Sequence, residues 1–185
     1  SVKVVDSGRS LSAENVIIAT GARPRELPTV PFDGDVVIGS REALELREVP
    51  ARAVIVGGGA IGVEFAYLWR AYGSEVTIVE LLPRLIPQED EEISTQLERA
   101  FKKQGIKSMT GATVEGISVD GNRARVSVSN GTEESVLECD KVLVAVGVQG
   151  NIENIGLEAL GVETDRGFVV IDEKMQTKVP GIYAV

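Results

Sequence analysis

The chain has 185 residues, with 28 acidic and 19 basic side chains and a formal net charge of −9. This charge argues against nucleic acid as a partner, because a polyanion would be repelled. The sequence has no histidine and a single cysteine, so it excludes thiol–imidazole catalysis and an intrachain disulfide by these residues alone.

The apolar segments are short. None approaches the ~18 consecutive apolar residues of a membrane span, and no basic, apolar signal segment stands at the start. We therefore expect no membrane insertion and a cytoplasmic location. Cys139 stands at the start of an expected strand, 139–146, and is interpreted as a buried small residue rather than a nucleophile.

The first thirty residues alternate apolar and polar, which is typical of strands. The apolar run Val16–Ala19 predicts a strand, and Thr20-Gly21 predicts a tight turn at its end. Three closely spaced prolines then indicate an extended linker over residues 24–31. Ser40 is placed to cap a short helix that extends to about Leu46.

The next block alternates strand and helix signals. Apolar runs without alternation predict buried parallel strands, and glycines mark where helices end. A third strand after the second helix completes a doubly wound unit with right-handed crossovers. The expected elements are a strand over 53–56, a glycine turn, a helix over 60–72, a strand over 76–79 that ends at Glu80, and a helix over 90–104.

Between Ala112 and Val146 the hydrophobic period changes to two. Turn signals at Asp120-Gly121-Asn122 and Asn130-Gly131 separate three short strands. We therefore predict an α/β fold, a Rossmann-like parallel sheet with helices and an inserted antiparallel β-meander. The meander strands are expected at 113–119, 123–129 and 135–138, before a last parallel strand at 141–146.

The remaining residues predict a loop and a short strand, Phe168–Ile171. The chain stops inside an apolar run, Val179–Val185, with no polar terminator. We take this as a sign of truncation.

The segment Gly57-Gly58-Gly59-Ala60-Ile61-Gly62 matches the dinucleotide fingerprint G-x-G-x-x-G between a strand and a helix. Gly57 permits the tight turn, Gly59 has no side chain to block a pyrophosphate, and Gly62 lets the helix pack on the sheet. The pyrophosphate would meet unpaired N–H groups and the positive end of the helix dipole.

Glu80 stands at the end of the strand that follows the glycine turn and its helix, where the dinucleotide fingerprint has an acidic residue. A carboxylate there accepts hydrogen bonds from the adenosine ribose and repels a 2′-phosphate, which favours NAD over NADP. Arg84, four residues later, keeps the NADP alternative open. Glu64 is either a solvated helix position or a carboxylate facing the nicotinamide end of the cofactor.

Three segments together carry a family resemblance: Gly57–Ala66, Glu75–Glu80 and Leu82–Glu92. They resemble the pyridine nucleotide–disulfide oxidoreductases, and within that family they are most similar to the dihydrolipoamide dehydrogenases. Ile17–Pro24 and Thr177–Val185 extend the resemblance over nearly the whole chain.

The resemblance implies a domain order. Residues 1–30 would end a first FAD-domain segment, 31–150 would form the NAD-binding domain, and 151–185 would begin the return to the FAD domain. In the FAD segment, Thr20, Gly21 and Ala22 would touch the flavin nucleotide. The residues implied for the NAD site are Gly57, Gly58, Gly59, Ala60, Ile61, Gly62, Val63, Glu64, Glu80, Val114 and Gly147.

The resemblance also implies a function. The parent enzyme would pass electrons from dihydrolipoamide on an acyltransferase complex through a disulfide and FAD to NAD+, as a homodimer. The family's flavin fingerprint, Cys-x4-Cys pair and His/Glu pair are absent from these residues, so the segment alone is expected to be inactive. One departure is Gly147-Val148-Gln149-Gly150-Asn151, where many members have Gly-Arg-x-Pro-Asn.

Two alternatives remain at this stage. The first is another flavoprotein disulfide reductase or an NADH oxidase of similar architecture. The second is a stand-alone NADH-sensing module without catalysis.

Overall fold

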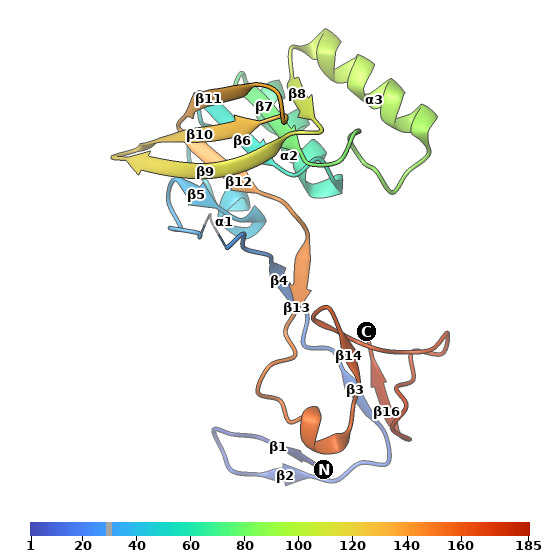
Figure 1. Cartoon of the computed structure of the whole chain (residues 1–185). Coiled ribbons are helices and arrows are strands. Elements are labelled where there is room, and N and C mark those ends of the chain that lie inside the picture. Colours follow the sequence, from blue (N-terminus) through green and yellow to red (C-terminus); the bar gives the residue numbers. More distant parts are fainter. Residues whose placement is uncertain (29–30) are drawn as a thin grey trace. The chain divides into compact units, whose positions relative to one another are not determined.

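The computed structural model describes residues 1–28 and 31–185. The chain divides into two compact units (Figure 1): Pro24–Gly147 forms the larger, and Ser1–Arg23 with Val148–Val185 forms the smaller. The predicted boundary at residue 30 lies outside the described residues.

The larger unit is built on a parallel sheet of five strands in the order β5-β12-β6-β7-β8. Helix α2 (Ala60–Ala71) joins β6 to β7, and helix α3 (Glu91–Gln104) joins β7 to β8. The predicted Rossmann-like sheet is confirmed. The strands are β5 (Val37–Ile38), β6 (Arg52–Val56), β7 (Glu75–Glu80), β8 (Lys107–Thr110) and β12 (Lys141–Val144).

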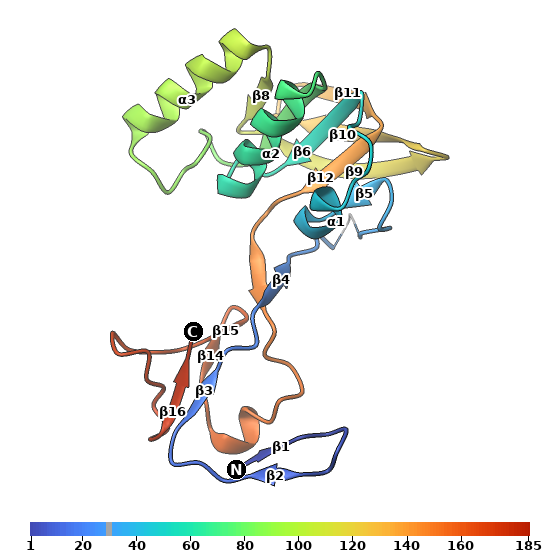
Figure 2. The same ribbon diagram turned by 180° about the vertical axis from the view of Figure 1, so that it is seen from behind.

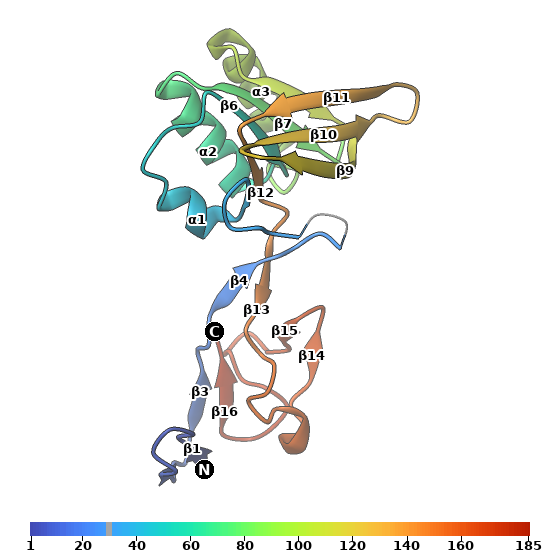
Figure 3. The ribbon, with the colours of Figure 1, turned by 90° about the vertical axis from the view of Figure 1, so that its left-hand side faces the viewer.

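Both faces of this sheet are covered (Figure 3), with helices on one side and a β-meander on the other. In β6, Ala53 and Ile55 belong to the core under the helices, whereas Val54 and Val56 belong to the core under the meander. A strand buried on both faces needs apolar residues at every position. This is the physical reason for the uninterrupted apolar runs in the sequence.

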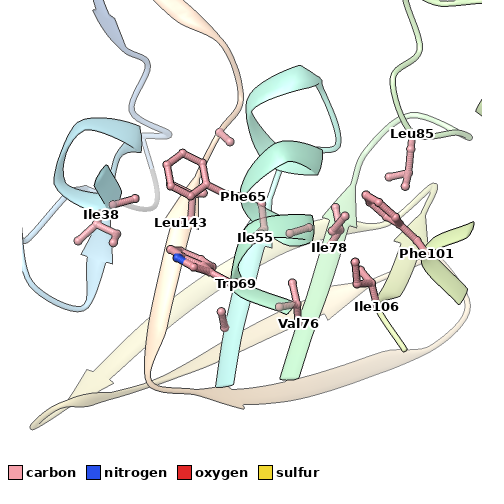
Figure 4. Packing of buried hydrophobic residues seen from close by; sticks show 14 residues of the cluster. Ile38, Ile55, Phe65, Trp69, Val76, Ile78, Leu85, Phe101, Ile106 and Leu143 are labelled. Carbon is pink, nitrogen blue, oxygen red and sulfur yellow. The ribbon is translucent and has the colours of Figure 1, made fainter. Parts of the chain in front are cut away.

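The core on the helix side centres on two aromatic residues of α2 (Figure 4). Phe65 and Trp69 have ring centroids 5.4 Å apart in a tilted arrangement. Phe101 of α3 and Leu85 of the loop before α3 belong to the same cluster. Both helices are thus held by large apolar side chains, which supply most of the burial energy at about 25 cal/mol per Å².

The meander comprises β9 (Thr113–Asp120), β10 (Arg123–Ser129) and β11 (Glu134–Cys139), all antiparallel, which confirms the predicted insertion. A bulge shifts its register, so that Val128 pairs with Val114 and Val126 pairs with Ile117. The extra residue brings Val114 and Ile117 onto the same inward face despite their odd spacing.

Two local predictions were wrong. Helix α1 (Ser40–Leu44) is capped by Gly39, whose N–H donates to the Glu42 carboxylate at 3.0 Å, so Ser40 is the first helical residue and the helix ends before Leu46. Cys139 ends β11 and does not start the last parallel strand, because the chain turns at Asp140 before β12 begins. Its predicted burial is confirmed, since Cys139 is 1% exposed.

The smaller unit consists of short paired strands (Figures 1 and 2). Strand β3 (Val16–Ile18) pairs in parallel with β16 (Ile182–Ala184), so segments from both ends of the chain share one sheet. The predicted strand 168–171 is reduced to β15. The other elements are β1 (Val2–Lys3), β2 (Ser10–Leu11), β13 (Val148–Gly150), β14 (Thr164–Asp165), β15 (Phe168–Val169), a 3-10 turn η1 (Glu158–Leu160) and β4 (Ala22–Pro24), whose last residue belongs to the larger unit.

Within residues 1–28 and 31–185, no helix has both the length and the apolar character needed to cross a membrane.

Candidate dinucleotide-binding site

The glycine turn lies at the carboxyl end of β6, in the middle of the sheet. The chain proceeds from β6 to β7 on one side, while β12 lies on the other side of β6. Open α/β sheets bind ligands at such a switch in strand order, outside the carboxyl ends of the strands. Glu80 ends β7, and Ala145–Gly147 follow β12, so both reach the same edge as Gly57–Gly62.

Two glycines of the turn are required by close packing. Gly57 has φ 109°, and a Cβ there would overlap the carbonyl oxygen of Ala145. A Cβ on Gly62 would overlap the carbonyl oxygen of Gly57. These contacts hold the first turn of α2 tightly against the ends of β6 and β12.

Gly59 is different, because an added Cβ would meet nothing within 4 Å and its φ of −75° suits any residue. Nothing in the fold of the described residues demands glycine here, whereas an anion that approaches the backbone would. The first intrahelical bond runs from Val63 N–H to Gly59 O at 3.0 Å. Helix geometry leaves the N–H groups of Ala60, Ile61 and Gly62 ahead of that bond, where they can meet an anion.

Glu80 is 9% exposed as a whole residue, and its carboxylate also supports the turn. Its Oε2 accepts a hydrogen bond from Gly58 N–H at 2.5 Å, and its Oε1 accepts one from Leu82 N–H at 2.7 Å. A carboxylate has about four acceptor positions, so each oxygen keeps one for a ligand hydroxyl. This second, structural role of Glu80 was not predicted from the sequence.

The loop between β7 and α3 also braces the glycine turn. Ile86 N–H donates to Gly58 O at 2.7 Å, although Ile86 is β-branched and has φ 41°. Leu85 is fully buried, and its N–H donates to the Glu98 carboxylate of α3 at 3.0 Å. This bracing of the glycine turn was not predicted from the sequence. The apolar pair Leu85-Ile86 inside a proline-flanked loop was the available signal for a packed loop.

Arg84 is held inside that loop. Its Nη2 donates to the carbonyl oxygens of Pro87 and Glu89, both at 3.1 Å, and the side chain forms an ion pair with Glu91 at 3.8 Å. A guanidinium committed to these carbonyls is poorly placed to recognise a 2′-phosphate.

Some of the other residues expected in the NAD site lie near this edge of the sheet. Ala112 N–H donates to Glu80 O at 3.0 Å, which brings the start of β9, and so the half-buried Val114, near the end of β7. Gly147 is exposed with φ 104° after β12. On α2, Val63 packs partly against the core, while Glu64 is exposed.

The residues expected at the flavin lie in the smaller unit. Thr20, Gly21 and Ala22 are exposed, and Gly21 has φ 72°. The carbonyl oxygens of Thr20 and Gly21 accept hydrogen bonds from Asn151.

A model of the family described as "Pyridine nucleotide-disulphide oxidoreductase" matches residues 1–185. The chain belongs to this family. Family membership associates the chain with flavin and nicotinamide nucleotides, as the resemblance implied.

The chain is 47% identical over 180 residues to a dihydrolipoyl dehydrogenase of Chlorobaculum tepidum, which covers 97% of this chain and 38% of the relative. It is 44% identical over 183 residues to a dihydrolipoyl dehydrogenase of Mycobacterium leprae, with 98% and 39% covered. The predicted similarity to dihydrolipoamide dehydrogenases is confirmed. The chain spans well under half the length of these curated relatives.

Solved structures support the same fold. LpdA from Mycobacterium tuberculosis superposes with a TM-score of 0.83 at 30% identity, over 93% of this chain and 37% of that one. The HOCl-induced flavoprotein disulfide reductase RclA from Escherichia coli, in its Cu(II) complex, gives a TM-score of 0.80 at 32% identity, over 93% and 38%. These neighbours favour a flavoprotein disulfide reductase over a stand-alone sensor.

Proposed function

We propose that the chain is the NAD-binding portion of a dihydrolipoyl dehydrogenase. The whole enzyme would pass electrons from dihydrolipoamide through a disulfide and FAD to NAD+. The observation that carries the proposal is the open approach to the backbone at Gly59, beside the buried carboxylate of Glu80. The similarity to dihydrolipoyl dehydrogenases supports the same conclusion.

The residues at the sheet edge fit a dinucleotide. The N–H groups of Gly59–Gly62 would bind the pyrophosphate, and Glu80 would accept the ribose hydroxyls through its free lone pairs. The rest of the site would be lined by Gly57, Gly58, Val63, Glu64, Val114 and Gly147. When bound, NAD+ supplies hydride acceptance, and the chain's own part is to hold and orient it.

We further propose that residues 31–150 form the NAD domain and that 1–30 and 151–185 belong to an FAD domain. Thr20–Ala22 would contact FAD there. The proposed partner is dihydrolipoamide carried by an acyltransferase complex, and the proposed assembly is a homodimer. A cytoplasmic location stays a prediction.

The test is an assay of the full-length protein that contains this chain. We expect it to reduce NAD+ with dihydrolipoamide as the electron donor and to use NADP+ poorly. Oxidation of NADH or NADPH by other disulfides, with no reaction of dihydrolipoamide, would instead place it with reductases of the RclA kind.

A further inference from the structure

A hydrogen-bonded cluster in the smaller unit joins two segments about 130 residues apart in sequence. Arg23 Nη2 contacts the Glu153 carboxylate at 2.6 Å, and Arg23 Nη1 donates to Asn151 Oδ1 at 2.9 Å. Gln149 Nε2 donates to the same Glu153 carboxylate at 3.1 Å. The Arg23 hydrogen bond lowers the pKa of Glu153 to about 2, so the pair stays charged at neutral pH.

Asn151 links this cluster to the exposed turn at Thr20–Ala22 through two hydrogen bonds. Its side-chain Nδ2 donates to Thr20 O at 3.1 Å, and its backbone N–H donates to Gly21 O at 2.9 Å. Arg23 fixes the amide orientation, because it donates to Oδ1 and so leaves Nδ2 for Thr20.

The two carbonyls determine where the neighbouring N–H groups point. A trans peptide is planar, with its C=O and N–H directed oppositely. Since the oxygens of Thr20 and Gly21 are directed at Asn151, the N–H groups of Gly21 and Ala22 are directed away from it. The cluster therefore presents two successive donors on the other side of the turn.

The backbone at Gly150 further restrains the segment that carries Asn151. Gly150 N–H donates a hydrogen bond to Gly167 O at 3.1 Å. A Cβ on Gly150 would lie 2.6 Å from that same oxygen. The segment that carries Asn151 is thus anchored on both sides.

We infer that Asn151, oriented by Arg23 and Glu153, is a positioning residue that aims the Gly21 and Ala22 N–H groups at polar oxygens of a bound flavin nucleotide. The inference rests on the proposed function, because it takes FAD as the ligand of this turn. Asn151 itself does not touch the ligand in this account.

The test uses the full-length protein and the variants Asn151→Ala and Asn151→Asp. Aspartate keeps the acceptor for Arg23 but has no amide hydrogen for Thr20 O. We expect the FAD dissociation constant, measured by flavin fluorescence, to rise about tenfold in both variants, which corresponds to about 1.4 kcal/mol. The NADH dissociation constant should stay unchanged in both, whereas general damage to the fold would alter it.

Glu163→Ala is the matched control, because it breaks a comparable exposed ion pair, with Lys178 at 2.7 Å, in the same unit. We expect its FAD affinity to equal that of the wild type, while Glu153→Ala weakens FAD binding. If the wild type binds FAD and Asn151→Asp binds it with unchanged affinity, the inference about Asn151 is overturned, while the proposed function is not affected. A wild-type protein that binds no FAD would overturn the proposed function and the inference with it.

Discussion

At the scale of single residues, two glycines of one turn serve different needs. Gly62 is required by packing against the Gly57 carbonyl, whereas the space around Gly59 is open. The fold depends on the first glycine, and the proposed ligand depends on the second.

This contrast predicts that alanine at Gly62 lowers stability, whereas alanine at Gly59 lowers the affinity for NADH. Gly62→Ala should lower the free energy of unfolding by about 1–3 kcal/mol, the usual cost of overpacking. Gly59→Ala should leave unfolding nearly unchanged but weaken NADH binding at least about tenfold. Urea denaturation and calorimetric titration measure the two effects. Equal NADH affinity in Gly59→Ala and the wild type would contradict the proposed pyrophosphate position.

Glu80 combines both roles, so its removal should affect stability as well as binding. Glu80→Ala leaves the Gly58 and Leu82 N–H groups without their charged acceptor. Hydrogen bonds to charged groups contribute about 1.5–3 kcal/mol each. We expect denaturant unfolding of Glu80→Ala to show a loss of at least about 2 kcal/mol. A variant as stable as the wild type would mean that these two hydrogen bonds contribute little.

Cys139 should be chemically inert in the folded protein. Burial raises the pKa of its thiol from an ordinary 9.0 to about 11, so the reactive thiolate is scarce at pH 8. We expect slow labelling by a thiol reagent in buffer and rapid labelling in urea. Because the folded pKa is raised, stability from the neutral thiol is complete below pH 9 and falls as pH rises toward 11. Fast labelling under native conditions would contradict the burial.

At the scale of elements, the end of α3 shows how one conformation stops a helix. Gly105 follows the helix with φ 80°, and its N–H donates to Lys102 O at 3.2 Å. Only glycine adopts this left-handed conformation without strain.

Gly105→Ala should therefore destabilise the larger unit by about 1–2 kcal/mol. Gly116→Ala in β9 is the control, because Gly116 has no positive φ and no atom within 4 Å of an added Cβ. Thermal unfolding should distinguish the two variants. Equal midpoints would show that the helix ends without help from Gly105.

Elements with a strong local signal could be predicted from the sequence. The order β6, α2, β7 follows from apolar runs, a glycine turn and Gly73, and the meander from two turn signals. Features set by tertiary contacts could not. The packing of Leu85 depends on Glu98, which lies thirteen residues away. The cap of α1 is local but has a weak sequence signal, because Gly39 has no capping side chain and its N–H donates to the Glu42 carboxylate. The same limit applies to the site, where the motif gave Gly59 and Glu80 but not the bracing loop.

At the scale of the whole molecule, the chain comprises two units, and only the larger carries the proposed NAD site. The smaller unit brings together residues from both ends of the chain through β3 and β16. The curated relatives are more than twice as long as these 185 residues, so the proposed catalytic cycle would need a larger protein than this chain.

The central claim is that the edge beside Glu80 binds NAD(H) and discriminates against NADP(H). Calorimetric titration of the chain with NADH and, separately, with NADPH tests it most directly. The account predicts measurable binding of NADH and at least about tenfold weaker binding of NADPH, since a carboxylate repels the 2′-phosphate. Tighter binding of NADPH would contradict both the role of Glu80 and the dihydrolipoyl dehydrogenase assignment.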